Sequence, residues 1–191
     1  MADHTTYGLV CSELSEDLSK TNLGELKLDS FQDNSVQIKI KAASLNFPDL
    51  LMTQGKYQNR PNLPFALGME GAGIVEKVGS GVSSFKEGDE VMFGGWGHGA
   101  IAESIILPEG LVSLKPKSLN FSEAASFKTA YLTAYVGLIR RGELKQGETL
   151  LVHGASGGVG MAAVQMGKLY GARVIASGTS DEKLKIVKTW G

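Results

Sequence analysis

The first half of the chain alternates apolar and polar residues in short runs, a pattern typical of half-buried strands. Residues 35–43, SVQIKIKAA, place Val36, Ile38 and Ile40 on one face and polar side chains on the other. Further short strands, separated by glycine and proline turns, are predicted at residues 73–78, 90–93, 101–107 and 111–114. Antiparallel strands at this spacing predict a small barrel or sandwich. Residues 48–54 instead predict one or two turns of helix.

Near residue 120 the pattern changes to helices that alternate with strands. A helical pattern opens at Ser122 and runs to about Arg141, and Gly142 stands where a helix C-cap is expected. Strand, helix, strand and helix are then predicted at residues 149–153, 158–170, 173–177 and 181–189. We therefore expect a β domain at residues 1–121 and an α/β domain at residues 122–191. Two parallel strands make a small sheet, so we also expect this chain to be part of a longer protein.

A glycine-rich segment joins the first parallel strand to the helix that follows it. Residues 150–160 read LLVHGASGGVG, with the spacing GxxGxxG, a variant of GxGxxG. A strand, a tight glycine turn and a helix N-terminus together form a site for the pyrophosphate of a dinucleotide. The predicted cofactor-binding residues of this segment are Gly154, Ala155, Ser156, Gly157, Gly158, Val159 and Gly160. The alternative is a glycine-rich turn in an ordinary α/β protein.

Composition and charge narrow the possible partners. The chain is 42% hydrophobic and 20% charged, with a formal net charge of −1, which is typical of a soluble globular protein. The sequence contains no stripe of basic residues, so we do not expect it to bind nucleic acid or an anionic membrane. No secretory segment and no apolar run of about 18 residues is present, so we expect a cytoplasmic protein. The single cysteine, Cys11, excludes an intramolecular disulfide and a cysteine-built structural zinc site.

Five segments resemble the medium-chain dehydrogenase/reductase superfamily, in the same order. They are LNFPDLLMTQGKY (45–57), PFALGMEGAGIVEKVGSGV (64–82), GDEVM (88–92), TAYVGL (133–138) and ETLLVHGASGGVG (148–160). The resemblance is greatest to the zinc-free NADPH:quinone oxidoreductase branch, with enoyl-thioester reductases as relatives. It implies an N-terminal GroES-like β-barrel domain, a partial Rossmann domain with a parallel βαβ unit, and an active-site cleft between them. It also implies that full-length relatives form homodimers.

Residues 68–70 bear on the question of a metal. Alcohol dehydrogenases of the superfamily have a GHE motif whose histidine binds the catalytic zinc, whereas this chain has Met69 at that place. A thioether is a poor Zn²⁺ ligand compared with imidazole or thiolate. The superfamily's cysteine-rich zinc lobe is also missing, and His98 is expected to be an exposed loop histidine. We therefore predict no metal site.

The end of the second parallel strand bears on the choice of cofactor. NAD-specific sites place an acid there to accept from the ribose 2′-OH, whereas this chain has Ser177. Ser177 and Thr179 can donate to a 2′-phosphate, and Lys183 would add positive charge; the alternative for Lys183 is a solvated helix lysine. The acidic residues 181–182 lie about where the spacing rule puts the acid, but residues 179–182 also fit a capping box that opens the next helix. We expect NADPH rather than NADH.

Reduction by hydride transfer needs a side chain that donates a proton or a hydrogen bond to the developing oxyanion. The resemblance places Asn46, in LNFPD, next to the nicotinamide, where its amide can donate to an oxygen. Tyr57 matches the active-site tyrosine that ends an enoyl-reductase segment, and a phenol can protonate an enolate. Thr133 is a further candidate contact of the nicotinamide. Each residue also has a purely structural alternative. Asn46 would then cap a loop, Tyr57 would pack as an aromatic side chain, and Thr133 would be a threonine inside a helix without a functional role.

The sequence therefore predicts a zinc-free, NADPH-dependent reductase of quinones or α,β-unsaturated carbonyls. An enoyl-thioester (enoyl-CoA or enoyl-ACP) reductase is the alternative among enzymes, because LNFPD also resembles the LNFxD segment of polyketide-type enoyl reductases. Outside enzymes, the alternatives are an NADPH-binding structural or RNA-binding protein and an inactive fragment. The sequence does not identify the acceptor.

Overall fold

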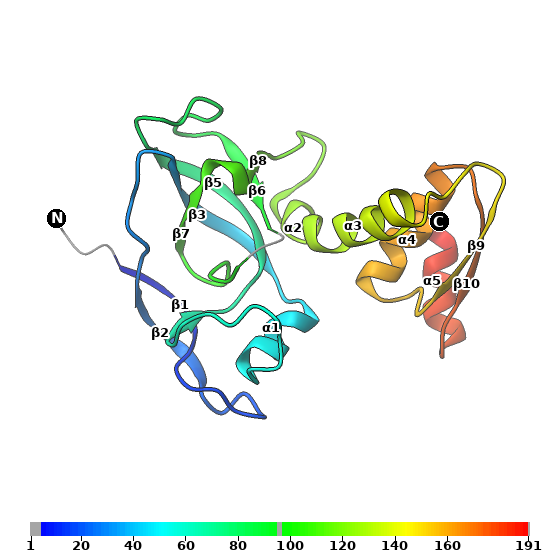
Figure 1. Ribbon diagram of the computed structural model, residues 1–191, viewed down its shortest axis with the longest axis horizontal. Coiled ribbons are helices and arrows are strands. Elements are labelled where there is room, and N and C mark those ends of the chain that lie inside the picture. Colours follow the sequence, from blue (N-terminus) through cyan, green and yellow to red (C-terminus); the bar gives the residue numbers. More distant parts are fainter. Residues whose placement is uncertain (1–4, 95–96, 191) are drawn as a thin grey trace. The chain divides into compact units, whose positions relative to one another are not determined.

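The structure, a computed structural model, describes residues 5–94 and 97–190. It divides into two compact units, residues 1–128 and residues 129–191 (Figure 1). Each unit has its own hydrophobic core. The domain boundary expected between residues 121 and 122 stays a prediction.

Two antiparallel sheets form the first unit and confirm the predicted barrel-like fold (Figure 1). One sheet has the order β2-β1-β4, and its strands are β1 (Thr5–Cys11), β2 (Thr21–Lys27) and β4 (Phe65–Ala66). The other has the order β7-β3-β5-β6-β8, with β3 (Ser35–Ser44), β5 (Glu70–Val78), β6 (Glu90–Phe93), β7 (Ser104–Pro108) and β8 (Val112–Leu114). A short 3₁₀ turn, η1 (Glu109–Leu111), precedes β8. A single bridge between Gly8 and Ala102 ties β1 to the chain that leads into β7.

β3 is an interior strand of the five-stranded sheet and confirms the strand that its alternation predicts. Val36 and Ile38 are fully buried and Ile40 packs against the same core. The ladder with β5 shifts register after Ile40, which curls the sheet. A Cβ on Gly73 would lie 2.2 Å from the Lys39 carbonyl oxygen, so the strands approach this closely only because residue 73 is glycine. The core also contains Val75, Val91, Phe93, Ala100, Ile105 and Val112.

The strands β1, β2 and β4 were not predicted, because their patterns are weak. In β1 the buried positions include Thr6 and Gly8, so the inward face is not apolar throughout. Gly8 is needed there, since a Cβ would lie 2.5 Å from the Ile101 carbonyl oxygen. β2 has no fully buried residue and lies at the edge of its sheet. β4 has only two residues.

The helical pattern predicted from Ser122 to Arg141 is not one helix. It is divided into α2 (Phe121–Ala125), α3 (Lys128–Tyr135) and a π-helical segment, η2 (Val136–Arg141). α2 begins at Asn120, whose side chain accepts the N–H of Glu123 at 2.9 Å. The same helix packs Ala124 and Ala125 against Ala72 and Met92 of the five-stranded sheet.

The second unit confirms the predicted partial Rossmann unit. Its elements after η2 are β9 (Thr149–His153), α4 (Gly158–Leu169), β10 (Arg173–Ser177) and α5 (Asp181–Trp190) (Figure 1). β9 and β10 pair in parallel, in register from Thr149–Arg173 to His153–Ser177. Val152, Ala162, Val164 and Val187 are among the residues that fill the core between the sheet and its helices. Leu151 and Ile175, which are register partners, are instead exposed.

None of the helices within the described residues is long and apolar enough to cross a membrane.

The turn after η2 holds a non-glycine residue in the left-handed region. Gly142 is the C-cap, as predicted, but its φ of −82° is an ordinary value. Glu143, the next residue, has φ of +49°. A side chain with a Cβ is strained in that region by about 1–2 kcal/mol.

We predict that Glu143→Gly raises the free energy of unfolding by about 0.5–1 kcal/mol. Relief of left-handed strain outweighs the extra entropy that glycine gives the unfolded chain. Denaturant titration followed by circular dichroism measures the change. The control, Glu143→Ala, keeps the strain and is expected to stay within about 0.5 kcal/mol of the wild type. A destabilised glycine variant contradicts the prediction.

Candidate functional site

The glycine turn between β9 and α4 has the shape of a phosphate cradle. Gly154 is left-handed, with φ of +64°, and Gly157 is the N-cap of α4. A Cβ on Gly160 would lie 2.3 Å from the Gly154 carbonyl oxygen, so the helix approaches the turn closely only with glycine there. At Gly158 no heavy atom lies within 4 Å of an added Cβ. The turn is therefore closed toward the protein and open at the helix N-terminus, where backbone N–H groups attract anions.

The other residues of the turn divide into inner and outer ones. Ala155 is fully buried, and its N–H donates to the Ser177 carbonyl oxygen at 3.0 Å. This bond ties the turn to the end of β10. Ser156 and Val159 are exposed. Of the predicted cofactor residues here, Ala155 thus holds the turn, while Ser156, Gly157, Gly158 and Val159 line its open side.

Ser177 occupies the strand tip, as predicted, and has a partner that sequence reasoning missed. His153, the last residue of β9, places its Nδ1 atom 2.8 Å from the Ser177 Oγ atom. The two residues form the last rung of the parallel ladder. The position of His153 immediately before the first glycine was the signal that could have identified it.

The start of α5 corrects the predicted capping box. Ser180, not Thr179, caps the helix: its Oγ accepts the N–H of Lys183 at 3.4 Å. Asp181 and Glu182 accordingly lie in the first turn of α5 and not at the strand tip. Thr179 and Lys183 are exposed, so both side chains are accessible from solvent.

In the first unit Asn46 is held by a carboxylate. Its amide nitrogen lies 3.0 Å from Glu70 Oε1 and 3.1 Å from Ser44 Oγ. The Ser44 hydroxyl in turn donates to Glu70 Oε1 at 2.6 Å. The carboxylate and the serine hydroxyl therefore fix which side of Asn46 is the donor side.

Two buried carboxylates lie around this asparagine. Asp49 and Glu70 are each only 1% exposed. Asn46 is the N-cap of α1 (Phe47–Thr53), and its N–H donates to Asp49 Oδ2 at 2.7 Å. The N–H of Gly68 donates to Asp49 Oδ1 at 3.1 Å. Burial raises the pKa of Asp49 above its ordinary value; the two N–H groups oppose this rise, and the charge of Glu70 adds to it.

An apolar hollow lies beside Asn46. Its volume is about 400 Å³, and it is lined by Leu9, Leu18, Thr21, Leu45, Asn46, Phe47, Leu50 and Leu67. Phe47 and Leu45 are 71% and 69% exposed, which is unusual for such large apolar side chains. The hollow is large enough for a small apolar molecule next to the amide of Asn46.

Met69 is a member of one small core against which Tyr57 packs. Met69 is 7% exposed and packs with Cys11, Met52, Phe65 and Leu67, and the half-buried Tyr57 packs against this cluster. No hydrogen bond of the Tyr57 hydroxyl is found within the described residues. Nor do three His, Cys, Asp or Glu side chains gather as a metal site anywhere in the described part of the chain.

Thr133 lies on α3 with its side chain exposed. Its hydroxyl donates to the Thr129 carbonyl oxygen one turn earlier, at 2.6 Å. That bond is common for a threonine inside a helix. The oxygen still has lone pairs, so Thr133 can act as an acceptor.

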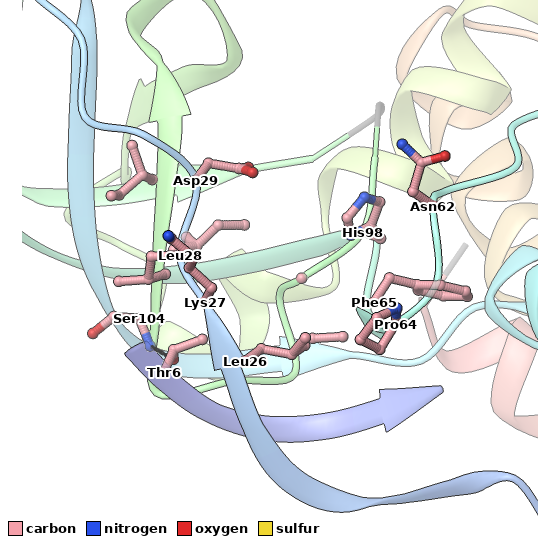
Figure 2. A pocket seen from close by; sticks show the side chains of 14 residues that line it. Thr6, Leu26, Lys27, Leu28, Asp29, Asn62, Pro64, Phe65, His98 and Ser104 are labelled. Carbon is pink, nitrogen blue, oxygen red and sulfur yellow. Dashed lines mark hydrogen bonds between the residues drawn. The ribbon is translucent and has the colours of Figure 1, made fainter. Parts of the chain in front are cut away.

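A second, more polar cavity of about 280 Å³ contains none of the predicted site residues. Figure 2 shows Lys27 and Asp29 on one side of it and Phe65 and His98 on the other. The exposed His98 ring lies edge-on to Phe65, with 5.5 Å between centroids. Desolvation by the residues around the ring lowers the pKa of His98, and the Asp29 carboxylate opposes this shift. His98 is thus exposed as expected, but it belongs to an ordered contact.

Comparison with known proteins identifies the family. Residues 32–117, which include Asn46, Tyr57 and Glu70, match the alcohol dehydrogenase GroES-like domain. Human quinone oxidoreductase is 38% identical over 156 residues, covering 82% of this chain and 47% of that protein. Escherichia coli quinone oxidoreductase complexed with NADPH has a TM-score of 0.85 and 32% identity, covering 98% of this chain and 56% of that chain. The chain belongs to the medium-chain dehydrogenase/reductase superfamily, in its quinone oxidoreductase branch.

The same comparison extends to enoyl reductases of this superfamily. The structure of CurK enoyl reductase has a TM-score of 0.87 and 31% identity, covering 97% of this chain and 57% of that chain. The chain spans about half the length of the curated relatives that it matches. The Escherichia coli quinone oxidoreductase and the CurK enoyl reductase therefore both share the two units of this chain.

We predict that Gly160→Ala destabilises the second unit by about 1–3 kcal/mol, because its Cβ would overlap the Gly154 carbonyl oxygen. Hydrogen exchange of the β9 amides measures this unit alone. The matched control is Gly158→Ala in the same turn, where no atom is in the way. We expect that variant to be neutral or up to about 1 kcal/mol more stable. Equal losses in both variants would show that the close approach is not the cause.

We predict that Asp49→Asn lowers the free energy of unfolding by about 1–3 kcal/mol at pH 5. An amide has one acceptor oxygen where the carboxylate offers two, so one buried N–H loses its partner. Urea denaturation of both proteins measures the loss. The exposed Glu87→Gln serves as control and is expected to change stability by less than about 0.5 kcal/mol.

The pH dependence of that difference has a defined sign. The folded state binds the Asp49 proton more tightly than the unfolded chain, because burial raises the pKa. The advantage of the native residue over the Asp49→Asn variant should therefore fall as pH rises from about 4 through the folded-state pKa. A difference that grows over this range contradicts the assignment.

Proposed function

We propose that the full-length protein reduces quinones or α,β-unsaturated carbonyls with NADPH and without zinc. The observation that carries this proposal is the open glycine cradle at the N-terminus of α4, next to a strand tip occupied by Ser177 and not by an acid. An acid there would bind a ribose 2′-OH and repel a 2′-phosphate. The related Escherichia coli quinone oxidoreductase, whose structure is a complex with NADPH, supports the same choice of cofactor.

The residues of the second unit fit such a cofactor. Gly157, Gly158 and the neighbouring N–H groups would hold the pyrophosphate, while Ser177, Thr179 and Lys183 would contact the 2′-phosphate. Bound there, the cofactor supplies the hydride. Thr133 is a further contact in this proposal, as an acceptor for the carboxamide of the nicotinamide.

Asn46 has the role of donor to the developing oxyanion. Its amide is oriented by Glu70 and Ser44, and it lines the apolar hollow with Phe47. A donor that is fixed before the reaction stabilises charge without reorganising. An acceptor that is already electrophilic needs no metal to polarise it. This agrees with the position of the zinc-binding histidine, which is occupied here by Met69 packed in an apolar core.

An enoyl-thioester reductase is the second candidate function. The likeness to CurK enoyl reductase favours it, together with the Tyr57 hydroxyl, which has no partner in the described structure and can protonate an enolate. We propose a cytoplasmic homodimer with a small-molecule substrate in either case. NADPH binding without turnover would instead support a structural role.

The test is NADPH oxidation by the full-length protein with a quinone panel and a short enoyl-CoA panel. We expect turnover with quinones that persists after exhaustive chelation of metals. Tyr57→Phe should then lower kcat/KM less than threefold with quinones but about 100-fold with enoyl-CoA, because general acid catalysis contributes about that much. A matched control is Tyr7→Phe, an exposed tyrosine of the same unit. Absence of turnover with both panels contradicts both enzymatic proposals.

A further inference from the structure

His153 and Ser177 form a pair whose mutual contact has no part in the proposed reaction. Both lie at the carboxyl ends of parallel strands, where Rossmann-type sheets bind their ligands. Their contact, 2.8 Å from Nδ1 to Oγ, is short enough for a well-formed hydrogen bond. The backbone of Ser177 is already fixed, because its carbonyl oxygen accepts the N–H of Ala155. Only the direction of the hydroxyl hydrogen is left to be set.

That direction decides what Ser177 offers a nucleotide. If Nδ1 of His153 has the proton, it donates to Ser177 Oγ, and the serine hydrogen is free to donate to a phosphate oxygen. If Nδ1 is a bare acceptor, it takes the serine hydrogen, and Ser177 offers only lone pairs, which suit a ribose hydroxyl. A phosphate has only acceptors, so it needs the first arrangement.

We propose that His153 is a positioning residue for cofactor selection: with its proton on Nδ1, it turns the Ser177 hydroxyl outward as a donor to the 2′-phosphate of NADPH. This inference rests on the proposed function. His153 acts through Ser177, and its effect is confined to ligands that have the phosphate. The adenosine end of the cofactor is therefore selected by two adjacent strand ends and not by the tip of β10 alone.

Two nucleotides that differ only in this group provide the test. Adenosine 2′,5′-bisphosphate and adenosine 5′-monophosphate are titrated into the full-length protein, and the ratio of their Kd values measures discrimination. We expect His153→Leu to reduce this ratio at least about threefold, with the monophosphate Kd changed less than twofold, because the Ser177 hydroxyl is then spread over about three rotamers and is no longer held in the one that donates to the phosphate. His153→Asn, which keeps an N–H near the Nδ1 position, should restore the ratio to within about twofold.

A double-mutant cycle separates positioning from direct contact. Ser177→Ala should lose at least as much discrimination as His153→Leu, and the double variant should lose no more than Ser177→Ala alone. Additive losses would mean that His153 binds the phosphate itself, which overturns the proposal. His98→Leu, a histidine change in the other unit, is the control and should leave both Kd values unchanged.

Imidazole ¹⁵N chemical shifts give a readout that does not depend on affinity. The bisphosphate should shift the His153 ring to the form with a protonated Nδ1, while the monophosphate should not. If the wild type discriminates between the two nucleotides and His153→Leu has the same ratio of Kd values, this inference is overturned and the proposed function stays intact. Equal binding of the two nucleotides, or binding of neither, overturns the NADPH assignment and this inference with it.

Discussion

The second unit depends on one close approach, that of the first turn of α4 to the carbonyl oxygen of Gly154. The approach exists because residue 160 has no side chain, and it fixes where the helix N-terminus lies relative to the end of β9. A similar constraint acts further along α4, where a Cβ on Gly167 would lie 2.7 Å from Leu150 and 2.9 Å from Val174. Gly160 thus sets the start of the helix close to the turn, and Gly167 lets its later part lie close to the side chains of β9 and β10. The open side of the turn follows from this packing.

In the first unit the corresponding constraint is electrostatic. Two buried carboxylates are stabilised by N–H and O–H donors from three segments: the end of β3, the start of α1 and the loop before β5. A buried carboxylate is costly unless it is hydrogen-bonded, so these donors must stay in place. Asn46 is one of them, and its orientation is a product of this network. The hollow beside it is apolar.

The sequence predicted most elements that have a strong period. β3, β6, β9, α4 and β10 all agree with their predicted spans to within one residue. β1 was missed because a threonine and a glycine take inward positions, and β2 was missed because none of its residues is fully buried. The glycine cradle was predictable because a close backbone approach demands glycine. Partners across strands were not: the bonds from Glu70 to Asn46 and from His153 to Ser177 join positions 24 residues apart in each case.

The π-helical segment η2 has a consequence for how related chains differ in length. A π turn is an α-helical turn with one residue inserted, and the N–H of Gly142 accordingly donates to the carbonyl oxygen of Gly137, five residues earlier. Removing one residue there would leave a regular helix, so this segment can lose a position without breaking its hydrogen bonding. A sequence alignment that places a one-residue gap between residues 136 and 141 would then record a change of helical winding within one conserved fold, and not the loss of a loop.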